Sequence, residues 1–133
     1  MDAYDLEIYE LMMDVFDSMP ISAVVDDKYL AMHGGISPEI LKIDEINKVD
    51  RFKEVPLDGI MCDLLWADPM KDDQAIRGKF VPNKDRDCSY YFGKKPTKQL
   101  LERNQLQSIL RGHQVQIAGF KMHRWDGPYQ RES

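Results

Sequence analysis

Apolar residues recur every three or four positions near the start of the chain, from Tyr4 to Met19. The recurring residues are Ile8, Leu11, Met12, Val15, Phe16 and Met19. This spacing places them on one face of a helix, and the acidic residues at its start suit a helix N-terminus. Pro20 follows, and proline ends helices because it lacks an N–H. The pattern therefore predicts an amphipathic helix over residues 4–19.

Short apolar runs separated by turn-type residues come next. Residues 21–25 and 29–32 are two such runs joined by a polar turn, so we expect a hairpin or two adjacent strands. Short helices are expected over residues 40–49. A compact apolar run over residues 61–66 then ends at Asp68-Pro69, a dipeptide typical of turns.

The second half of the chain opens with a polar segment, residues 70–84, that shows no periodicity. We expect it to be a surface loop and the most mobile part of the chain. Pro96 should open a helix that closes near Asn104. Three further runs predict strands, at residues 88–92, 106–110 and 119–122.

Two histidines stand just after predicted strands. His33 follows residues 29–32, and the Gly34-Gly35 pair behind it would let the backbone turn with no side chain crowding an incoming metal ion. His113 ends the segment Arg111-Gly112-His113 and repeats this arrangement after residues 106–110. Judged on pattern alone, an incidental histidine at a strand–turn–helix junction remains the favoured alternative for His33.

Ser37 and Pro38 follow the two glycines. Serine is a preferred N-cap, and proline suits the first helical turn, where a missing N–H costs nothing. The sequence therefore predicts that a helix begins at this point.

The composition suits one globular domain, or part of one: 133 residues, of which 43% are hydrophobic and 31% charged. No run is long and apolar enough to cross a bilayer, and Asp2, Asp5 and Glu7 stand where a secretory signal would carry positive charge. We therefore expect a soluble, cytoplasmic protein that uses no membrane.

The net charge of -5 argues against a nucleic-acid surface, which needs a clustered basic face. A phosphorylated ligand would need a local positive site built from metal or arginine. Cys62 and Cys88 form no C-x-x-C pair, which excludes a zinc knuckle and argues against a disulfide framework. Both are expected as buried free thiols.

Other polar and aromatic residues are assigned structural roles. Asp63 and Asp68 could form a carboxylate pair, but a structural role is favoured for both. Trp66 and the aromatic residues at 90–92 are expected to fill the core. His123 is expected at the surface. No serine or cysteine has a histidine placed as in a catalytic triad, so nucleophilic catalysis has no support.

Four segments in this order resemble the phosphoprotein phosphatases: MHGGISPEI, DRFKEVPLDGIMCDLLWADP, DRDCSYYFG and LLERNQLQSILRGHQVQIAGFKM. These enzymes are metal-dependent serine/threonine phosphatases, and the closest likeness among them is to calcineurin catalytic subunits. The resemblance implies an α/β metallophosphoesterase fold, a β-sandwich flanked by helices. Residues 1–124 resemble the C-terminal part of such a catalytic domain, and residues 125–133 are expected to form a polar tail.

The resemblance also implies a site. Such enzymes use two divalent metal ions, such as zinc, iron or manganese, to activate a water that attacks phosphorus. His33 and His113 match the two histidines that bind one of these ions, and neutral imidazole binds them without adding negative charge. Arg86 matches an arginine that clamps the substrate phosphate, for which the forked guanidinium is suited.

Parts of the family pattern do not occur here. The motifs D-x-H, G-D-x-x-D-R-G and G-N-H-E, which supply the remaining ligands and the leaving-group acid, are absent from the sequence, as is a later S-A-P-N-Y segment. The resemblance thus implies a domain incomplete at both ends and inactive alone. Asp87 stands where the family usually has glycine, Ala67 where serine is common, and Gly112 where alanine is common.

The implied function of the complete protein is hydrolysis of phosphoserine or phosphothreonine in phosphoproteins, with a regulatory calcium-binding subunit and calmodulin as possible partners. The alternative is a non-catalytic, phosphatase-derived structural or interaction module. A sheet without the family's N-terminal strands would leave edges and apolar surface open to a partner. A truncated gene model is a third possibility, which the residues do not rank.

Overall fold

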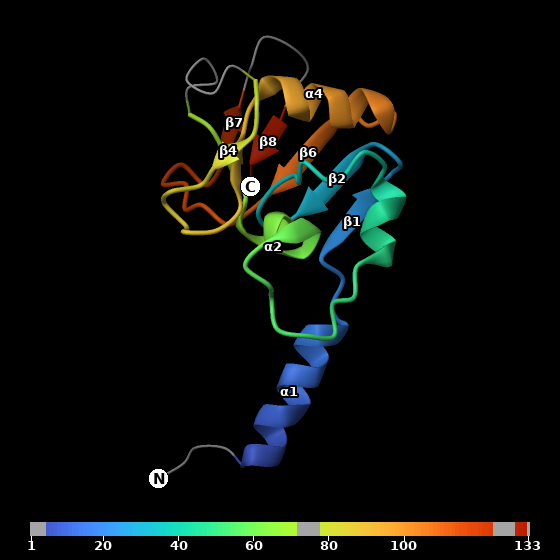
Figure 1. Ribbon diagram of the computed structural model, residues 1–133, viewed down its shortest axis with the longest axis vertical. Helices are drawn as coiled ribbons and strands as arrows, with labels where there is room; N and C mark the ends of the chain where they lie inside the picture. Colours follow the sequence, from blue (N-terminus) through green and yellow to red (C-terminus); the bar gives the residue numbers. More distant parts are fainter. Residues whose placement is uncertain (1–4, 72–77, 124–129, 133) are drawn as a thin grey trace.

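The computed structural model describes residues 5–71, 78–123 and 130–132. Two sheets and the helices beside them form the body, and helix α1 (Leu6–Ser18) projects from it (Figure 1). The mixed α/β class predicted from the sequence is confirmed. Within the described residues, no helix is long and apolar enough to span a membrane.

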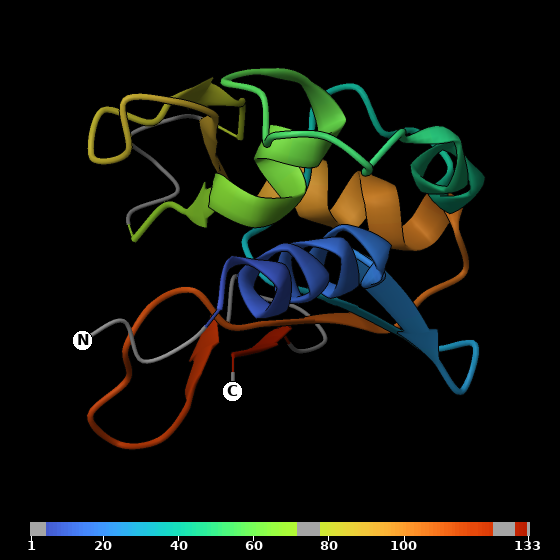
Figure 2. The same cartoon turned by 90° about the horizontal axis from the view of Figure 1, so that it is seen from below.

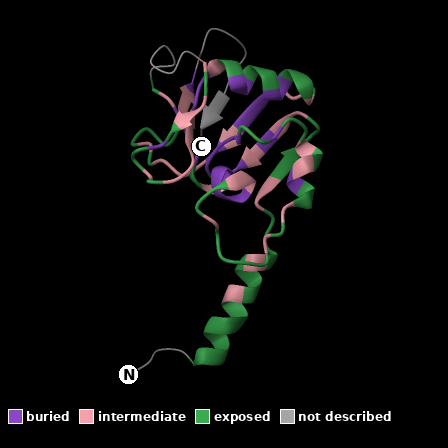
Figure 3. Ribbon diagram, in the orientation of Figure 1, coloured by how far each residue is buried: buried purple, intermediate pink, exposed green. Residues whose placement is uncertain are grey.

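Helix α1 has the amphipathic pattern predicted for it, but its apolar side chains are exposed. None of its residues is buried, and Figure 3 shows the helix almost entirely in the exposed class. The large apolar residues that are exposed on α1 and at its C-cap are Leu6, Ile8, Tyr9, Leu11, Met12, Val15, Phe16 and Met19. The periodicity thus identified the helix correctly, but its apolar face is left exposed by the described residues.

The larger sheet contains five strands in the order β1-β2-β6-β8-β7. Their bounds are Ser22–Val25, Tyr29–Met32, Ser108–Arg111, Gln130–Glu132 and Lys121–His123, in that spatial order. The predicted hairpin is confirmed, because β1 and β2 are antiparallel and Asp26 and Asp27 take positive φ values of 52° and 49° in the turn. β2 and β6 are parallel, with Met32 paired to Arg111. Their carboxyl ends therefore lie at the same edge of the sheet.

The smaller sheet has three strands in the order β3 (Asp68–Pro69), β5 (Tyr90–Phe92) and β4 (Val81–Pro82). The turn predicted at Asp68-Pro69 was wrong: the dipeptide is an edge strand, which proline tolerates. β4 lies within the segment predicted to be a surface loop. Residues 72–77 of that segment lie outside the described residues.

The remaining helices are short. The helical turns predicted after residue 40 form a 3-10 helix, η1 (Ile43–Lys48), and the apolar run before Asp68 is α2 (Gly59–Trp66). Helix α4 (Lys94–Arg103) begins two residues before Pro96, which therefore lies in the first turn, where no N–H is needed. It closes near Asn104 as predicted: Asn104 is the C-cap, and its side-chain amide donates to the carbonyl of Leu100 at 2.8 Å.

The hydrophobic core lies between the five-stranded sheet and helices α2 and α4, which cover the same side of that sheet (Figure 2). Leu30 of β2 and Ile109 of β6 are 1% and 3% exposed. They pack in one cluster with Leu64 of α2, Leu100 of α4 and Phe92 of β5. This packing fixes the ends of β2 and β6 relative to α2.

The two glycines after His33 are required by close packing. A Cβ on Gly34 would lie 2.5 Å from the carbonyl carbon of Leu65, and one on Gly35 would lie 2.2 Å from the Phe92 ring. The structure adds a packing reason for these two glycines, because the chain passes close against α2 and β5 here.

Three further expectations are corrected. Ser37 does not begin a helix; its hydroxyl accepts the Glu39 N–H at 3.2 Å in a turn. His123 is 8% exposed in β7, not at the surface. Part of the expected polar tail, Gln130–Glu132, is strand β8, whereas residues 124–129 and 133 lie outside the described residues. A three-residue strand is too short to show a period in sequence.

Candidate metal and phosphate site

The parallel pairing of β2 and β6 brings His33 and His113 together. His33 directly follows β2, and the N–H of Gly112, beyond the end of β6, donates to the His33 carbonyl at 3.1 Å. His113 has a φ of 68°, a left-handed conformation that turns its side chain back toward this edge. Nδ1 of His113 then lies 3.0 Å from Nε2 of His33, and the ring centroids are 4.8 Å apart.

This separation can be compared with metal geometry. Metal–imidazole bonds of about 2.0–2.1 Å place two nitrogens in neighbouring positions on one ion about 3.0–3.4 Å apart. The facing nitrogens of His33 and His113 fit the short end of this range, and without metal they share a hydrogen bond. Nε2 of His113 is buried and has no hydrogen-bond partner among the described residues. The pair therefore fits a divalent ion.

The protonation state of His113 supports the same conclusion. Burial lowers the pKa of His113 to about 4, and the positive charge of Arg86 acts in the same direction. The negative charge of Asp68, whose Oδ1 lies 3.9 Å from Nε2 of His113, opposes this shift. His113 is therefore uncharged near neutral pH, which is the form that binds metals.

Asp68 joins two arginines at the centre of the site. Its Oδ2 accepts hydrogen bonds from Nε of Arg86 and from the Asn83 amide, both at 3.0 Å, and its Oδ1 accepts one from Nη2 of Arg111 at 3.0 Å. Burial raises the pKa of Asp68, but these hydrogen bonds and positive charges outweigh it and hold that pKa below its usual range. Asp68 is thus a buried anion that positions arginine side chains.

Arg86 reaches Asp68 from the segment between β4 and β5. Its side chain is 29% exposed, and the Nε contact with Asp68 leaves the two terminal nitrogens outside this ion pair. Those nitrogens are the fork that binds two oxygens of a phosphate in parallel. The next residue, Asp87, has a φ of 57°, as expected if the family's glycine there serves a left-handed turn.

Arg111 is a buried residue of the site that the sequence did not single out. Its side chain is 3% exposed; Nη2 donates to the Ala67 carbonyl at 3.2 Å, and Nε donates to the Gly34 carbonyl. These bonds tie the His33 loop to β3. The available signal was a charged residue ending the apolar run before Gly112.

Asp63 has the structural role favoured for it. Its carboxylate is fully buried and accepts hydrogen bonds from the hydroxyls of Ser37 and Ser89, each at 2.6 Å. Burial raises the pKa of Asp63, and these hydrogen bonds oppose the rise. Asp63 thereby holds the segment after His33 and the segment after Arg86 against α2.

Trp66 was expected in the core, and this was wrong. Its side chain is 39% exposed, and its ring meets the His113 ring edge-on, with centroids 5.5 Å apart. Phe92 fills the core as expected, at 1% exposed. Trp66 therefore borders the histidine pair, where its bulk limits the positions open to the His113 ring.

The chain itself offers an incomplete set of metal ligands. No group of three or more His, Cys, Asp or Glu side chains that could hold a metal occurs within residues 5–71, 78–123 and 130–132. Structural and catalytic zinc sites use at least three protein ligands. In a complete site, His33 and His113 would thus share their ion with ligands from another segment, whose positions water would fill in the chain alone.

Comparison with known proteins gives the following matches. The family model described as calcineurin-like phosphoesterase matches residues 2–116. The serine/threonine-protein phosphatase 2B catalytic subunits A1 and A2 of Saccharomyces cerevisiae are 42% and 37% identical over 91% of this chain. The chain spans only 24% of the length of each of these relatives.

A solved structure from Saccharomyces cerevisiae, a protein serine/threonine phosphatase with similarity to human phosphatase PP5, has a similar fold. The two superpose with a TM-score of 0.81 at 27% sequence identity. The match covers 98% of this chain and 39% of that one.

Proposed function

Because the chain belongs to the calcineurin-like phosphoesterase family, we propose that it is part of the catalytic domain of a metal-dependent serine/threonine-protein phosphatase. One observation carries the proposal: His33 and His113 face each other at 3.0 Å beside an arginine that is anchored through Asp68. Metal-dependent hydrolysis of a phosphate ester uses both features, a metal ion to activate water and a positive fork to hold the phosphate oxygens.

The residues of this chain would have three roles: metal binding, phosphate binding and positioning. His33 and His113 would hold one divalent ion, zinc, iron or manganese, and two such ions in the complete enzyme would activate the attacking water. Arg86 would bind and orient the substrate phosphate. Asp68 and Arg111 are positioning residues: Asp68 anchors Arg86 and lies beside His113, and Arg111 binds Asp68 and the His33 loop.

The isolated chain is expected to be inactive. Two imidazoles leave a divalent ion short of ligands, and no residue here matches the acid that protonates the leaving group. We assign residues 1–124 to the catalytic domain, and we assign the remaining ligands to other parts of the complete protein. Its substrates would be phosphoproteins, its location the cytoplasm, and its possible partners a calcium-binding regulatory subunit and calmodulin.

A hybrid enzyme tests this proposal. This chain would replace the matched region of the A1 relative from Saccharomyces cerevisiae, and the purified hybrid would be assayed on a phosphoserine peptide with Mn²⁺. We expect turnover that is lost when His113 is changed to Asn, and no turnover by the isolated chain. A folded but inactive hybrid would contradict the proposal, as would an isolated chain as active as the hybrid.

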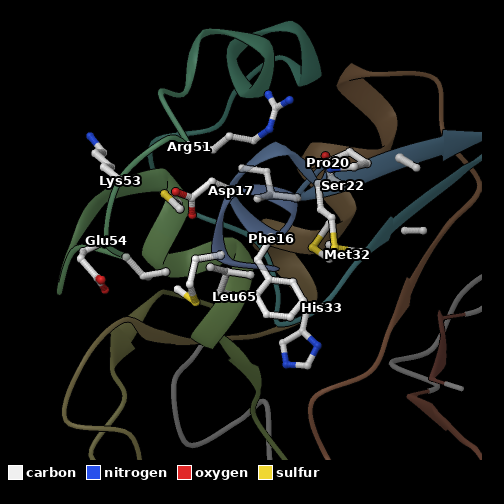
Figure 4. A pocket seen from close by; sticks show the side chains of 17 residues that line it. Phe16, Asp17, Pro20, Ser22, Met32, His33, Arg51, Lys53, Glu54 and Leu65 are labelled. Atoms are coloured by element: carbon white, nitrogen blue, oxygen red, sulfur yellow. The ribbon is translucent and has the colours of Figure 1, made fainter. Parts of the chain in front are cut away.

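The second candidate is a non-catalytic interaction module, and the exposed face of α1 favours it. Phe16 and Met13 of α1 line a hollow of about 660 Å³ together with Met32, Leu65 and the ring of His33 (Figure 4). Exposed apolar surface beside a hollow is typical of a binding site. A purified chain that holds a partner through α1 while binding no metal would support this function over the enzymatic one.

A further inference from the structure

Asn83 is a buried residue at the start of the segment that carries Arg86. It directly follows β4 and is 2% exposed. Its backbone N–H donates to the Ser89 carbonyl at 3.0 Å, and its own carbonyl accepts the Arg86 N–H at 3.4 Å. Residues 83–89 therefore form a loop whose two ends are joined by the bond between Asn83 and Ser89, with Arg86 in the middle of the loop.

The side-chain oxygen of Asn83 stabilises the backbone inside this loop. Oδ1 accepts the N–H of Asp85, two residues further on, at 3.1 Å. This is the hydrogen bond of an Asx turn, in which the side chain takes the place of a backbone carbonyl. The turn fixes the direction of the chain immediately before Arg86.

The side-chain nitrogen of Asn83 reaches the carboxylate that anchors Arg86. Nδ2 of Asn83 and Nε of Arg86 donate to the same oxygen, Oδ2 of Asp68, each at 3.0 Å. The other oxygen of Asp68 accepts a hydrogen bond from Arg111, also at 3.0 Å. Because Asp68 is 1% exposed, water competes little for these bonds. The carboxylate is thus held at both oxygens, and Asn83 contributes one of the three donors.

We propose that Asn83 is a positioning residue that fixes the guanidinium of Arg86 through the Asx turn and the shared carboxylate of Asp68. Without the Asn83 amide, Arg86 would keep its charge and its place in the sequence. Its fork would lose one constraint on the backbone and one on its anchor, so fewer of its orientations would suit two phosphate oxygens. The consequence for phosphate binding rests on the proposed function, whereas the effect on Arg86 itself does not.

A double-mutant cycle in the hybrid enzyme tests whether Asn83 acts through Arg86. We expect Asn83→Ala to lower kcat/KM on the phosphoserine peptide roughly tenfold, mainly through a higher KM, because a misaligned fork binds phosphate less well. In the Arg86→Lys background, the same change should lower kcat/KM by less than about twofold, since the fork is already lost. Additive losses would overturn the proposal, because a residue that only stabilises the fold acts independently of Arg86.

Asn104→Ala is the matched control. Asn104 is also an asparagine whose side chain ties a chain segment in place, but it does so at the end of α4, away from Asp68. Its side chain makes three hydrogen bonds to the backbone of Leu41, Ile43 and Leu100. We expect this variant to unfold at lower urea concentration than wild type and to keep its KM. A KM raised as much as in Asn83→Ala would count against a specific role of Asn83.

A second measurement on the chain alone needs no enzyme activity. Hydrogen exchange of the Arg86 Nε–H with water is followed by ¹⁵N NMR, and the signal is assigned by its loss in Arg86→Lys. We expect slow exchange in wild type and in Asn104→Ala, because the Nε–H is bound to buried Asp68. In Asn83→Ala the exchange should be several-fold faster.

Asn83→Ser separates the two contacts of the side chain. The serine hydroxyl can still accept the Asp85 N–H, but it is too short to reach Asp68. This variant should therefore keep more stability than Asn83→Ala while its Arg86 Nε–H also exchanges faster than in wild type. An inactive hybrid would refute the proposed function alone, and the exchange rates would still decide the role of Asn83. Wild-type exchange in both Asn83 variants would overturn that role.

Discussion

Nε of Arg86 donates to Oδ2 of Asp68 at 3.0 Å, so a half-exposed arginine is anchored to a carboxylate that is 1% exposed. The same carboxylate binds the buried guanidinium of Arg111. The negative charge of Asp68 holds two guanidinium groups that would otherwise repel each other. It also positions Arg86 at the edge of the sheet where His33 and His113 meet. Electrostatic positioning by Asp68 thus connects the core to the candidate phosphate site.

Removing this charge should destabilise the fold. Asp68→Asn would leave Arg111 buried beside a neutral group, and breaking a buried ion pair by removing one partner costs about 3–5 kcal/mol. Urea unfolding followed by circular dichroism measures the change. Asp27→Asn is the matched control, because Asp27 is exposed in a left-handed turn that asparagine also accepts. Equal stabilities of the two variants would show that Asp68 does not hold Arg111 by charge.

Replacing Arg86 by lysine should weaken substrate binding strongly and lower the stability of the fold only slightly. Lysine keeps the positive charge but loses the fork, and a hydrogen bond to a charged group is worth about 1.5–3 kcal/mol, or roughly tenfold to a hundredfold in affinity. We expect kcat/KM of the hybrid enzyme to fall by that factor, with the rise in KM dominant. Arg51→Lys, on a half-buried arginine away from Asp68, should leave kcat/KM unchanged. An unchanged kcat/KM in Arg86→Lys would exclude Arg86 as the phosphate clamp.

Two glycine substitutions should differ sharply in their effect on stability. The Cβ of Gly35→Ala would meet the Phe92 ring at 2.2 Å and the Ala67 carbonyl at 2.9 Å, and overpacking of this kind costs about 1–3 kcal/mol or more. In Gly112→Ala the added Cβ would meet only Nδ1 of His33, at 3.9 Å. We expect a clear loss of thermal stability for the first variant and a change within about 0.5 kcal/mol for the second. The reverse order would refute the packing reason given for Gly35.

The stability of the metal-free chain should depend on pH through His113. The folded chain keeps His113 neutral down to about pH 4, whereas in the unfolded chain the ring takes up a proton near pH 6.5. The unfolded state therefore binds more protons between these values, so the free energy of unfolding falls as the pH is lowered from 6.5 to 4. The pKa of Asp68 is held below its usual range in the folded chain, so Asp68 adds a further loss of stability as the pH falls below that range.

The His113→Asn variant isolates this contribution, because asparagine tolerates the positive φ at this position. Urea unfolding at several pH values should show a smaller fall in the free energy of unfolding for the variant than for wild type over this range. Parallel pH profiles of the two proteins would mean that His113 titrates normally in the folded chain.

The fold was predictable from sequence where the pattern was long or regular. The period of α1 and the hairpin of β1 and β2 were both visible in the order of apolar and polar residues. The two-residue strands β3 and β4 were not, because a period of two needs more residues to show. Burial of the single residue His123 and exposure of Trp66 leave no periodic signal either.

The candidate site was predictable only in part. The sequence showed two histidines at strand ends, and the family resemblance implied their pairing with Arg86 as neighbour. Asp68 and Arg111 are 43 positions apart, and their ion pair depends on how the two sheets are placed. No local sequence pattern predicts such a contact, so only the structure showed that Asp68 and Arg111 are positioning residues.

The central claim is that His33 and His113 hold the same metal ion. The most direct measurement is a titration of the chain, labelled with ¹⁵N in its histidine rings, with Zn²⁺ while the nitrogen resonances are followed. We predict that Nε2 of His33 and Nδ1 of His113 shift together in one step that ends at one ion per chain. A shift of one ring without the other, or of His123 in place of both, would contradict the shared site.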